Sequence, residues 1–157
     1  MTRLILALHV LCGLVAPLRA DPGDIDAAAR GVVRAAANNG FPCRVSLRDA
    51  DEGEELVLVH HVNHAVETPY RNAFAIYVRK DASEAARYID ECPPVFAGRP
   101  IALRGYDADG VLAAARLTLP GDADEGIRAL FDDAAIAYID AHNAAHGCFA
   151  ARIERHG

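Results

Sequence analysis

Short connections between strand-like segments are the feature of this sequence that most restricts its fold. Residues 107–110 (DADG) are a hairpin turn signal between two apolar segments. Strands joined by so few residues pair antiparallel, because parallel pairing needs a long crossover. Apolar alternation or continuity predicts strands over residues 43–48, 55–62, 73–79, 101–106, 111–119, 135–141 and 148–154.

Helical signals are fewer. Asp24 can cap a helix that ends before Asn38-Asn39-Gly40, and residues 82–90 have the pattern of a short helix. Asp122, three residues before Glu125, opens another helix. No linker divides the chain. We therefore predict one α+β domain over residues 1–157, with a mainly antiparallel sheet of about six or seven strands and two to four helices.

Residues 1–20 allow two interpretations. A basic start, an apolar stretch and Ala20 before Asp21 are typical of a signal peptide, and the alternative is an N-terminal helix of the domain. The stretch is short for a membrane span. Cleavage after Ala20 would remove one of the four cysteines and leave a poor disulfide framework. We expect a cytoplasmic protein, with a secreted or periplasmic one as the alternative.

Charge and motifs exclude several functions. The net charge of −6 argues against nucleic-acid binding, which needs a basic face. No Gly-rich phosphate loop follows a strand into a helix, so we expect no cofactor of that kind.

Five short motifs carry a family resemblance. They are residues 41–47 (FPCRVSL), 69–71 (PYR), 106–110 (YDADG), 142–143 (HN) and 147–152 (GCFAAR). In this order they resemble the bacterial family called domain of unknown function 1203, from about residue 18 to the C-terminus. The resemblance implies no reaction, substrate or cofactor, and it favours a cytoplasmic protein. The sequence departs from the family pattern at His60 and His61, and His64 and His146 are also particular to it.

An anion site is the leading functional hypothesis. If residues 43–48 and 55–62 form a hairpin, one rim of the sheet brings together Cys43, Arg44 and His60 with the loop that holds Tyr70 and Arg71. Two arginines could clamp a small carboxylate or phosphate. His142 and Asn143 would join this site if the strand order allows. The competing interpretation is that each arginine pairs with a surface carboxylate.

A thiol-dependent enzyme is the second hypothesis. Cys148 or Cys43 could act as the nucleophile, with His142 as the base and Asn143 as its orienting partner. The alternative is that Cys43 is a buried, inert thiol, and that His142 and Asn143 tie down the connection before Cys148.

Two further functional hypotheses are a metal site and a structural domain without a ligand. His60 with His64, and His142 with His146, have a spacing that binds zinc on a helix, but both pairs fall on strand ends or loops, so we expect no metal. A structural or oligomer-forming domain without a ligand is the third functional alternative.

Overall fold

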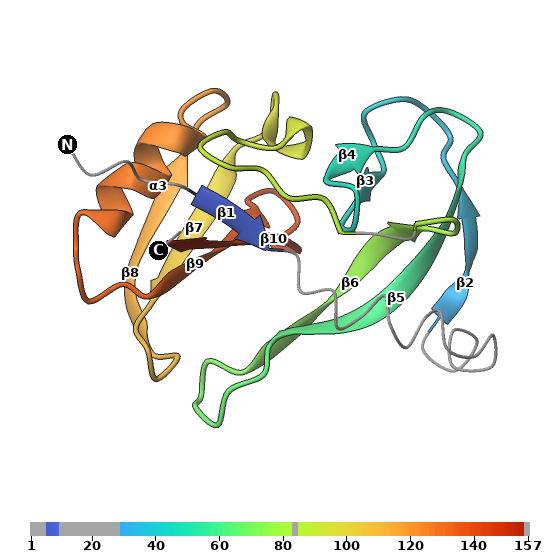
Figure 1. The fold of residues 1–157 in the computed structure, drawn as a ribbon. Coiled ribbons are helices and arrows are strands. Elements are labelled where there is room, and N and C mark those ends of the chain that lie inside the picture. Colours follow the sequence, from blue (N-terminus) through green and yellow to red (C-terminus); the bar gives the residue numbers. More distant parts are fainter. Residues whose placement is uncertain (1–5, 10–28, 83–84, 156–157) are drawn as a thin grey trace.

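The strands of this protein form two sheets. The computed structural model describes residues 6–9, 29–82 and 85–155 of the 157-residue chain (Figure 1). The elements are β1 (Leu6–His9), β2 (Ala29–Arg34), β3 (Pro42–Cys43), β4 (Arg48–Asp49), β5 (Glu55–His64), β6 (Asn72–Arg79), η2 (Pro94–Phe96), β7 (Ile101–Tyr106), β8 (Leu112–Thr118), α3 (Ala123–Phe131), β9 (Tyr138–Asn143) and β10 (Phe149–Arg155).

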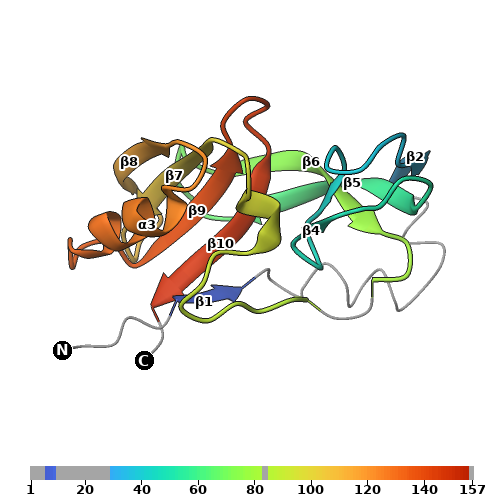
Figure 2. The ribbon, with the colours of Figure 1, turned by 90° about the horizontal axis from the view of Figure 1, so that it is seen from above.

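Each sheet contains five of the described strands. The first sheet has the order β1-β10-β9-β7-β8, and the second has the order β2-β5-β6-β3-β4. Neighbouring strands run antiparallel except β3 and β6, which pair in parallel at Cys43 and Tyr77. The β5–β6 hairpin extends from the second sheet past β9 and β7, on the side opposite to α3 (Figures 1 and 2). The first sheet is therefore covered on one side by a helix and on the other by a hairpin.

The predicted α+β architecture with one sheet is wrong. The described part of the chain contains one α-helix, α3, and one 3-10 turn, η2. Residues 29–34 form the edge strand β2 instead of a helix, because Gly31 adopts a φ of 119° and the segment pairs with β5. Residues 85–90 are irregular, and residues 83–84 lie outside the described residues. Within residues 1–20, only Leu6–His9 is described, and it is a strand, so the N-terminal interpretations fall largely outside the described residues.

The predicted strand over residues 43–48 is also wrong. β3 and β4 are joined by a turn in which the Leu47 amide donates to the Cys43 carbonyl at 3.1 Å and Leu47 has a φ of 53°. Arg44 and Val45 are both buried, so the expected alternation of inner and outer side chains does not occur. Val45 packs in the core of the second sheet and Leu47 in the core of the first. The turn thus connects two separate hydrophobic cores.

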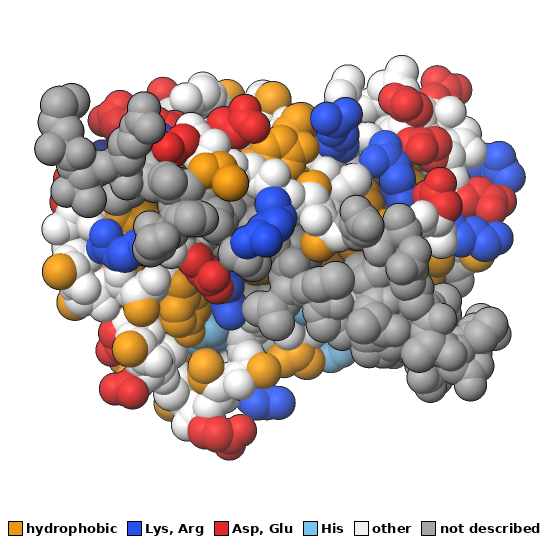
Figure 3. Space-filling view, in the orientation of Figure 1, with side chains coloured by type: hydrophobic (Ala, Val, Ile, Leu, Met, Phe, Trp, Pro, Cys, Tyr) orange, Lys and Arg blue, Asp and Glu red, His pale blue; other side chains and the backbone are white. Residues whose placement is uncertain are grey.

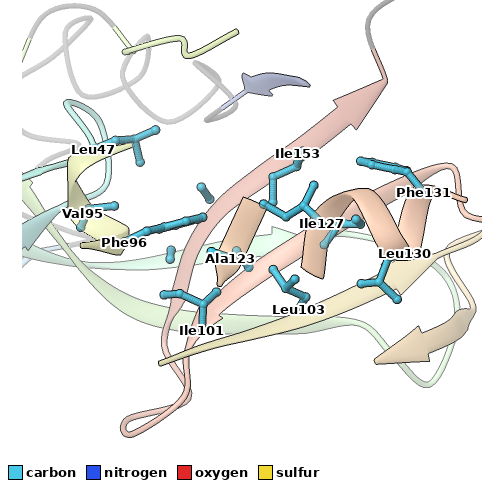
Figure 4. Packing of buried hydrophobic residues seen from close by; sticks show 14 of the residues in the cluster. Leu47, Val95, Phe96, Ile101, Leu103, Ala123, Ile127, Leu130, Phe131 and Ile153 are labelled. Atoms are coloured by element: carbon cyan, nitrogen blue, oxygen red, sulfur yellow. The ribbon is translucent and has the colours of Figure 1, made fainter. Parts of the chain in front are cut away.

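The helix predicted after Asp122 is confirmed and covers the larger core. Ile127 and Leu130 of α3 face Leu103 and Ile153 of the first sheet (Figure 4). This packing follows from the sequence, because alternate residues of β7 point to α3 while those between them point to the opposite face. The opposite face of the same strands is polar, and it is where the functional site is sought.

Replacing Gly126 by alanine is expected to lower the free energy of unfolding by about 1–3 kcal/mol, the usual cost of overpacking a core. In an exposed helix this change would instead stabilise by about 1 kcal/mol. Here the new Cβ would clash with Thr118 Cγ2 and lie 3.1 Å from Leu103 Cδ1. Urea unfolding of the variant measures the difference.

Thr118→Ser provides the matched control for this prediction. Serine removes Cγ2 but keeps the hydroxyl, which donates to the Ile101 carbonyl at 3.0 Å. The Gly126→Ala/Thr118→Ser double variant should recover most of the loss. A single Gly126→Ala variant more stable than the original protein would show that the helix has room at this position.

Candidate functional site

Three charged side chains form a row across the polar face of the first sheet. Arg104 on β7 is opposite Asp140 on β9, and Asp140 is opposite Arg152 on β10. Side chains at directly opposite positions of an antiparallel pair lie on the same face. The row therefore presents one carboxylate between two guanidinium groups to the β5–β6 hairpin.

Asp140 is completely buried and fully engaged. Its carboxylate accepts hydrogen bonds from Arg152 Nε at 2.8 Å, Arg152 Nη2 at 3.1 Å and Asn63 Nδ2 at 3.1 Å. Arg152 Nη2 also donates to the Asn63 carbonyl at 2.9 Å, which joins β10 to β5. Burial lowers the pKa of Arg152, but the hydrogen bonds and the charge of Asp140 outweigh it and raise this pKa above its ordinary value.

His64 attaches the end of the hairpin to the same face. Its Nδ1 lies 2.9 Å from the Tyr70 carbonyl, and its Nε2 lies 2.8 Å from the Tyr138 hydroxyl. A carbonyl only accepts, so Nδ1 carries the proton and Tyr138 donates to Nε2. The imidazole stacks on Tyr106, with the ring centres 4.1 Å apart. All polar atoms of His64 are thus satisfied in a structural role.

His142 is buried among aromatic rings. Its ring centre lies 5.1 Å from that of Phe74 on β6 and 5.9 Å from that of Phe149 on β10. Nδ1 contacts the Gly147 carbonyl at 3.1 Å, whereas Nε2 is buried and has no hydrogen-bond partner among the described residues. Burial, and then the positive charge of Arg104, lowers the pKa of His142 to about 4. The imidazole is therefore neutral at pH 7.

Arg44 approaches this region from the second sheet. Its Nε donates to the Phe149 carbonyl at 2.6 Å and its Nη1 to the Pro42 carbonyl at 2.7 Å. Burial lowers the pKa of Arg44 to about 10, so it stays charged at neutral pH. It lies close enough to His142 to oppose protonation of the imidazole. Among the described residues, the Arg44 guanidinium donates to carbonyls, and Asp49, the carboxylate whose charge acts to raise its pKa, is already paired with Arg99 at 2.7 Å.

Seven polar side chains lie between the first sheet and the β5–β6 hairpin, and we call them the inter-sheet polar layer. It consists of His61, Asn63, Asn72, Arg104, Asp140, His142 and Arg152. Within the described residues, Asp140 is paired with Arg152, while neither Arg104 nor Arg44 forms an ion pair. Buried atoms without a hydrogen-bond partner in the described part of the chain are His61 Nδ1, Asn63 Oδ1, Asn72 Oδ1 and His142 Nε2. The layer is therefore rich in positive charge and in unused acceptors.

The positive charge of the layer is not part of a general basic surface. On the face in Figure 3, basic and acidic side chains are intermixed where the surface is described. Arg104 is half-buried at the flank of the hairpin, next to Tyr106. Burial, and then the charge of Asp140, raises the pKa of Tyr106, while hydrogen bonds with Arg104 and Asn72 oppose the rise.

The structure separates some of the residues predicted to form the anion site. Arg44 lies beside Tyr77, since its amide donates to the Tyr77 carbonyl at 2.9 Å. Arg71 immediately precedes β6 and pairs with Glu67 at 3.4 Å on the surface. At about 3.3 Å per residue along the strand, Arg71 lies roughly 20 Å from Tyr77. Arg44 and His142 are brought near each other, and Arg71 is not.

Tyr70 and Asn143 lie at different ends of the polar face. Tyr70 is exposed at the hairpin end, with its ring centre 6.4 Å from that of Tyr106. Asn143 closes the β9–β10 turn: its side-chain oxygen accepts from the Ala145 amide at 3.1 Å. Together with the bond from His142 to Gly147, this confirms the interpretation that His142 and Asn143 tie down the connection before Cys148.

The hydrogen bonds of the described cysteines do not include one to His142. Cys43 is buried, and its sulfur accepts from the amides of Ser46 and Arg79. Cys148 Sγ contacts the His146 carbonyl at 3.8 Å, and the described residues include no hydrogen bond between this thiol and His142. Burial, and then the charge of Asp124, raises the pKa of Cys92 to about 11, which leaves that thiol protonated at neutral pH.

The histidine pairs do not converge as zinc ligands. His60 is exposed, whereas His64 is buried against Tyr138. Among the described residues, no group of three or more His, Cys, Asp or Glu side chains could hold a metal ion.

Sequence reasoning missed Arg104, Asp140 and Asn63. A signal for the first two was present, because each is a charged residue inside an otherwise apolar strand. In a sheet covered on both faces, such a residue needs a partner in the layer above it. The sequence did not indicate that the partner would come from β5.

The fold and this layer define a two-sheet β protein with one described α-helix and a charged interior between β7, β9, β10 and the β5–β6 hairpin. Along the described residues, no helix has the length and apolar character needed to cross a bilayer.

The family resemblance is confirmed. The family model described as protein of unknown function (DUF1203) matches residues 40–155, and the chain belongs to that family. No curated protein and no solved structure matches the chain.

Proposed function

We propose that this protein binds a small anion at Arg104, on the flank of the β5–β6 hairpin. The observation that carries the proposal is the imbalance of charge. Arg104 and Arg44 both lie close enough to His142 to oppose its protonation, and Asp140, the carboxylate of the layer, is already paired with Arg152 in the described part of the chain. A bound anion would balance the remaining positive charge.

Arg104 is the best anchor for such an anion. It is half-buried, so it is reachable from solvent but sits in a medium where charge interactions are stronger than in water. Asp140, directly opposite, is already occupied by Arg152 and Asn63. A guanidinium group can bind a carboxylate or phosphate through two parallel hydrogen bonds.

Two of the residues predicted from sequence support this site. Arg44 adds a buried positive charge near His142, and the neutral His142 offers Nε2 as a free hydrogen-bond acceptor. Tyr70 flanks the hairpin close to Tyr106, whereas Arg71 and Asn143 are engaged elsewhere. The ligand site that we propose therefore consists of Arg104, Arg44 and His142.

Calorimetric titration with small carboxylates and phosphate, at constant ionic strength, tests the proposal. We expect at least one of these anions to bind, and Arg104→Gln to weaken its binding tenfold or more through the loss of a charged hydrogen-bond donor, about 1.4 kcal/mol or more. Arg71→Gln is the matched control and should bind as the original protein does. Equal affinities of the Arg104→Gln variant and the original protein would refute the assignment.

A further inference from the structure

We infer that the anion taken at Arg104 carries a hydrogen-bond donor of its own, as hydrogen phosphate and hydroxycarboxylates do and as sulfate and simple carboxylates do not. The inference rests on the proposed anion site and specifies the chemical class of its ligand. It comes from the atoms of the inter-sheet polar layer that lack hydrogen-bond partners.

His142 supplies one such acceptor near Arg104. Its Nδ1 faces the Gly147 carbonyl at 3.1 Å, and a carbonyl can only accept, so Nδ1 must carry the proton. Nε2 of the neutral ring is therefore a lone pair. This atom is buried and has no donor among the described residues, although Arg104 is the strongest charged neighbour of the ring.

The two asparagines of the layer add acceptors of the same kind. Asn72 Nδ2 donates to the Tyr70 carbonyl at 2.9 Å, and Asn63 Nδ2 donates to the Asp140 carboxylate at 3.1 Å. Both partners are acceptors, which settles the orientation of each amide. Asn72 Oδ1 and Asn63 Oδ1 are thus oxygen acceptors, and both are buried without a described partner.

These acceptors lie on both sides of Arg104. Asn72 lies beside Tyr106 at one end of β7, and Phe74, two residues further along β6, packs against the edge of His142. Arg104 lies between Tyr106 and Ala102, and Ala102 is opposite His142. An anion held by Arg104 therefore lies between two sets of unused acceptors.

Apart from Arg104, which the anion would occupy, two donors beside these acceptors are already used. Arg152 donates to Asp140 and to the Asn63 carbonyl, and the Tyr138 hydroxyl donates to His64. A metal cation would also suit the free lone pairs, but Arg44 and Arg104 repel it. An anion with a hydroxyl group meets both requirements, because its charge pairs with the guanidinium and its proton reaches an acceptor. Buried acceptors left without a donor are costly, so the hydroxyl should improve binding.

Two ligand pairs test the inference on the intact protein at pH 7 and constant ionic strength. Phosphate is compared with sulfate, and glycolate with acetate, by calorimetric titration and by the shift in melting temperature. We expect the hydroxyl-bearing member of a pair to bind at least tenfold more tightly. Equal affinity within both pairs would overturn the inference and leave the anion site standing, whereas no binding of any of the four would overturn the anion site itself.

His142→Asn identifies the acceptor. The asparagine amide can still donate to the Gly147 carbonyl, but nothing replaces Nε2. We expect this variant to keep binding and to lose the preference for the hydroxyl-bearing anion. A preference that survives in a folded His142→Asn variant would contradict the role of His142. If that variant does not fold, Asn72→Ala provides the second measurement, and there the preference is expected to persist.

Discussion

Replacing Asp140 by alanine is expected to lower the free energy of unfolding by about 3–5 kcal/mol, the usual result of removing one member of a buried ion pair. Asp140 is fully buried and is held by three hydrogen bonds from Arg152 and Asn63. Its removal leaves the guanidinium of Arg152, whose side chain is 14% exposed, without its ion-pair partner. Urea unfolding at pH 7 measures the loss.

Two comparisons make this prediction specific. Glu67→Ala removes the acidic partner of the exposed pair with Arg71 and should change stability by less than about 1 kcal/mol, as surface pairs do. Asp140→Leu with Arg152→Met removes both buried charges, and it should be more stable than Asp140→Ala. A loss below about 1 kcal/mol for Asp140→Ala would show that the ion pair is far better solvated than its burial indicates.

His142 is expected to destabilise the folded protein in acid by about 3 kcal/mol. Its pKa is about 4 in the folded protein, against an ordinary value of 6.5 that applies when the chain is unfolded. The unfolded chain therefore binds the proton more readily. Above pH 6.5, His142 does not lower the free energy of unfolding. As the pH falls from 6.5 to 4, the free energy of unfolding decreases by about 1.4 kcal/mol per pH unit.

His142→Asn should flatten this part of the pH profile, because it removes the titrating group while an amide can still donate to Gly147. Burial and the charge of Arg152 also lower the pKa of His61, so some acid sensitivity will remain. His60→Asn, at an exposed position of β5, is the control and should change the profile less than His142→Asn does. Urea unfolding at several pH values between 4 and 7 provides the measurement. An unaltered profile in His142→Asn would mean that the imidazole is not held neutral.

Local signals were sufficient for several elements. The hairpin turn at residues 107–110 is formed by Asp107, whose side chain accepts from the Asp109 and Val111 amides. The helix after Asp122 forms because its apolar residues fall on one side, where the core of the first sheet lies. These elements depend on contacts between residues close in sequence, so a short window contains the information.

The same local reasoning failed where two structures fit one pattern. Val32 and Val33 are compatible with a helix or a strand, and pairing with β5 made the segment a strand. In residues 43–48, apolar alternation suggested one inner face, but Val45 and Leu47 pack into different cores. The sheets separated for a similar reason, because no local pattern states which strands become neighbours.

The sequence by itself determined the short antiparallel hairpins, the helix after Asp122, the family and two members of the candidate site, Arg44 and His142. Only the tertiary structure decided that β5 would cross the first sheet and bring Asn63 to Asp140, and that Arg104 would lie beside His142. The physical reason is that turn chemistry and side-chain periodicity act over a few residues. The partner of a buried charge is chosen by strand register between segments that are far apart in the chain.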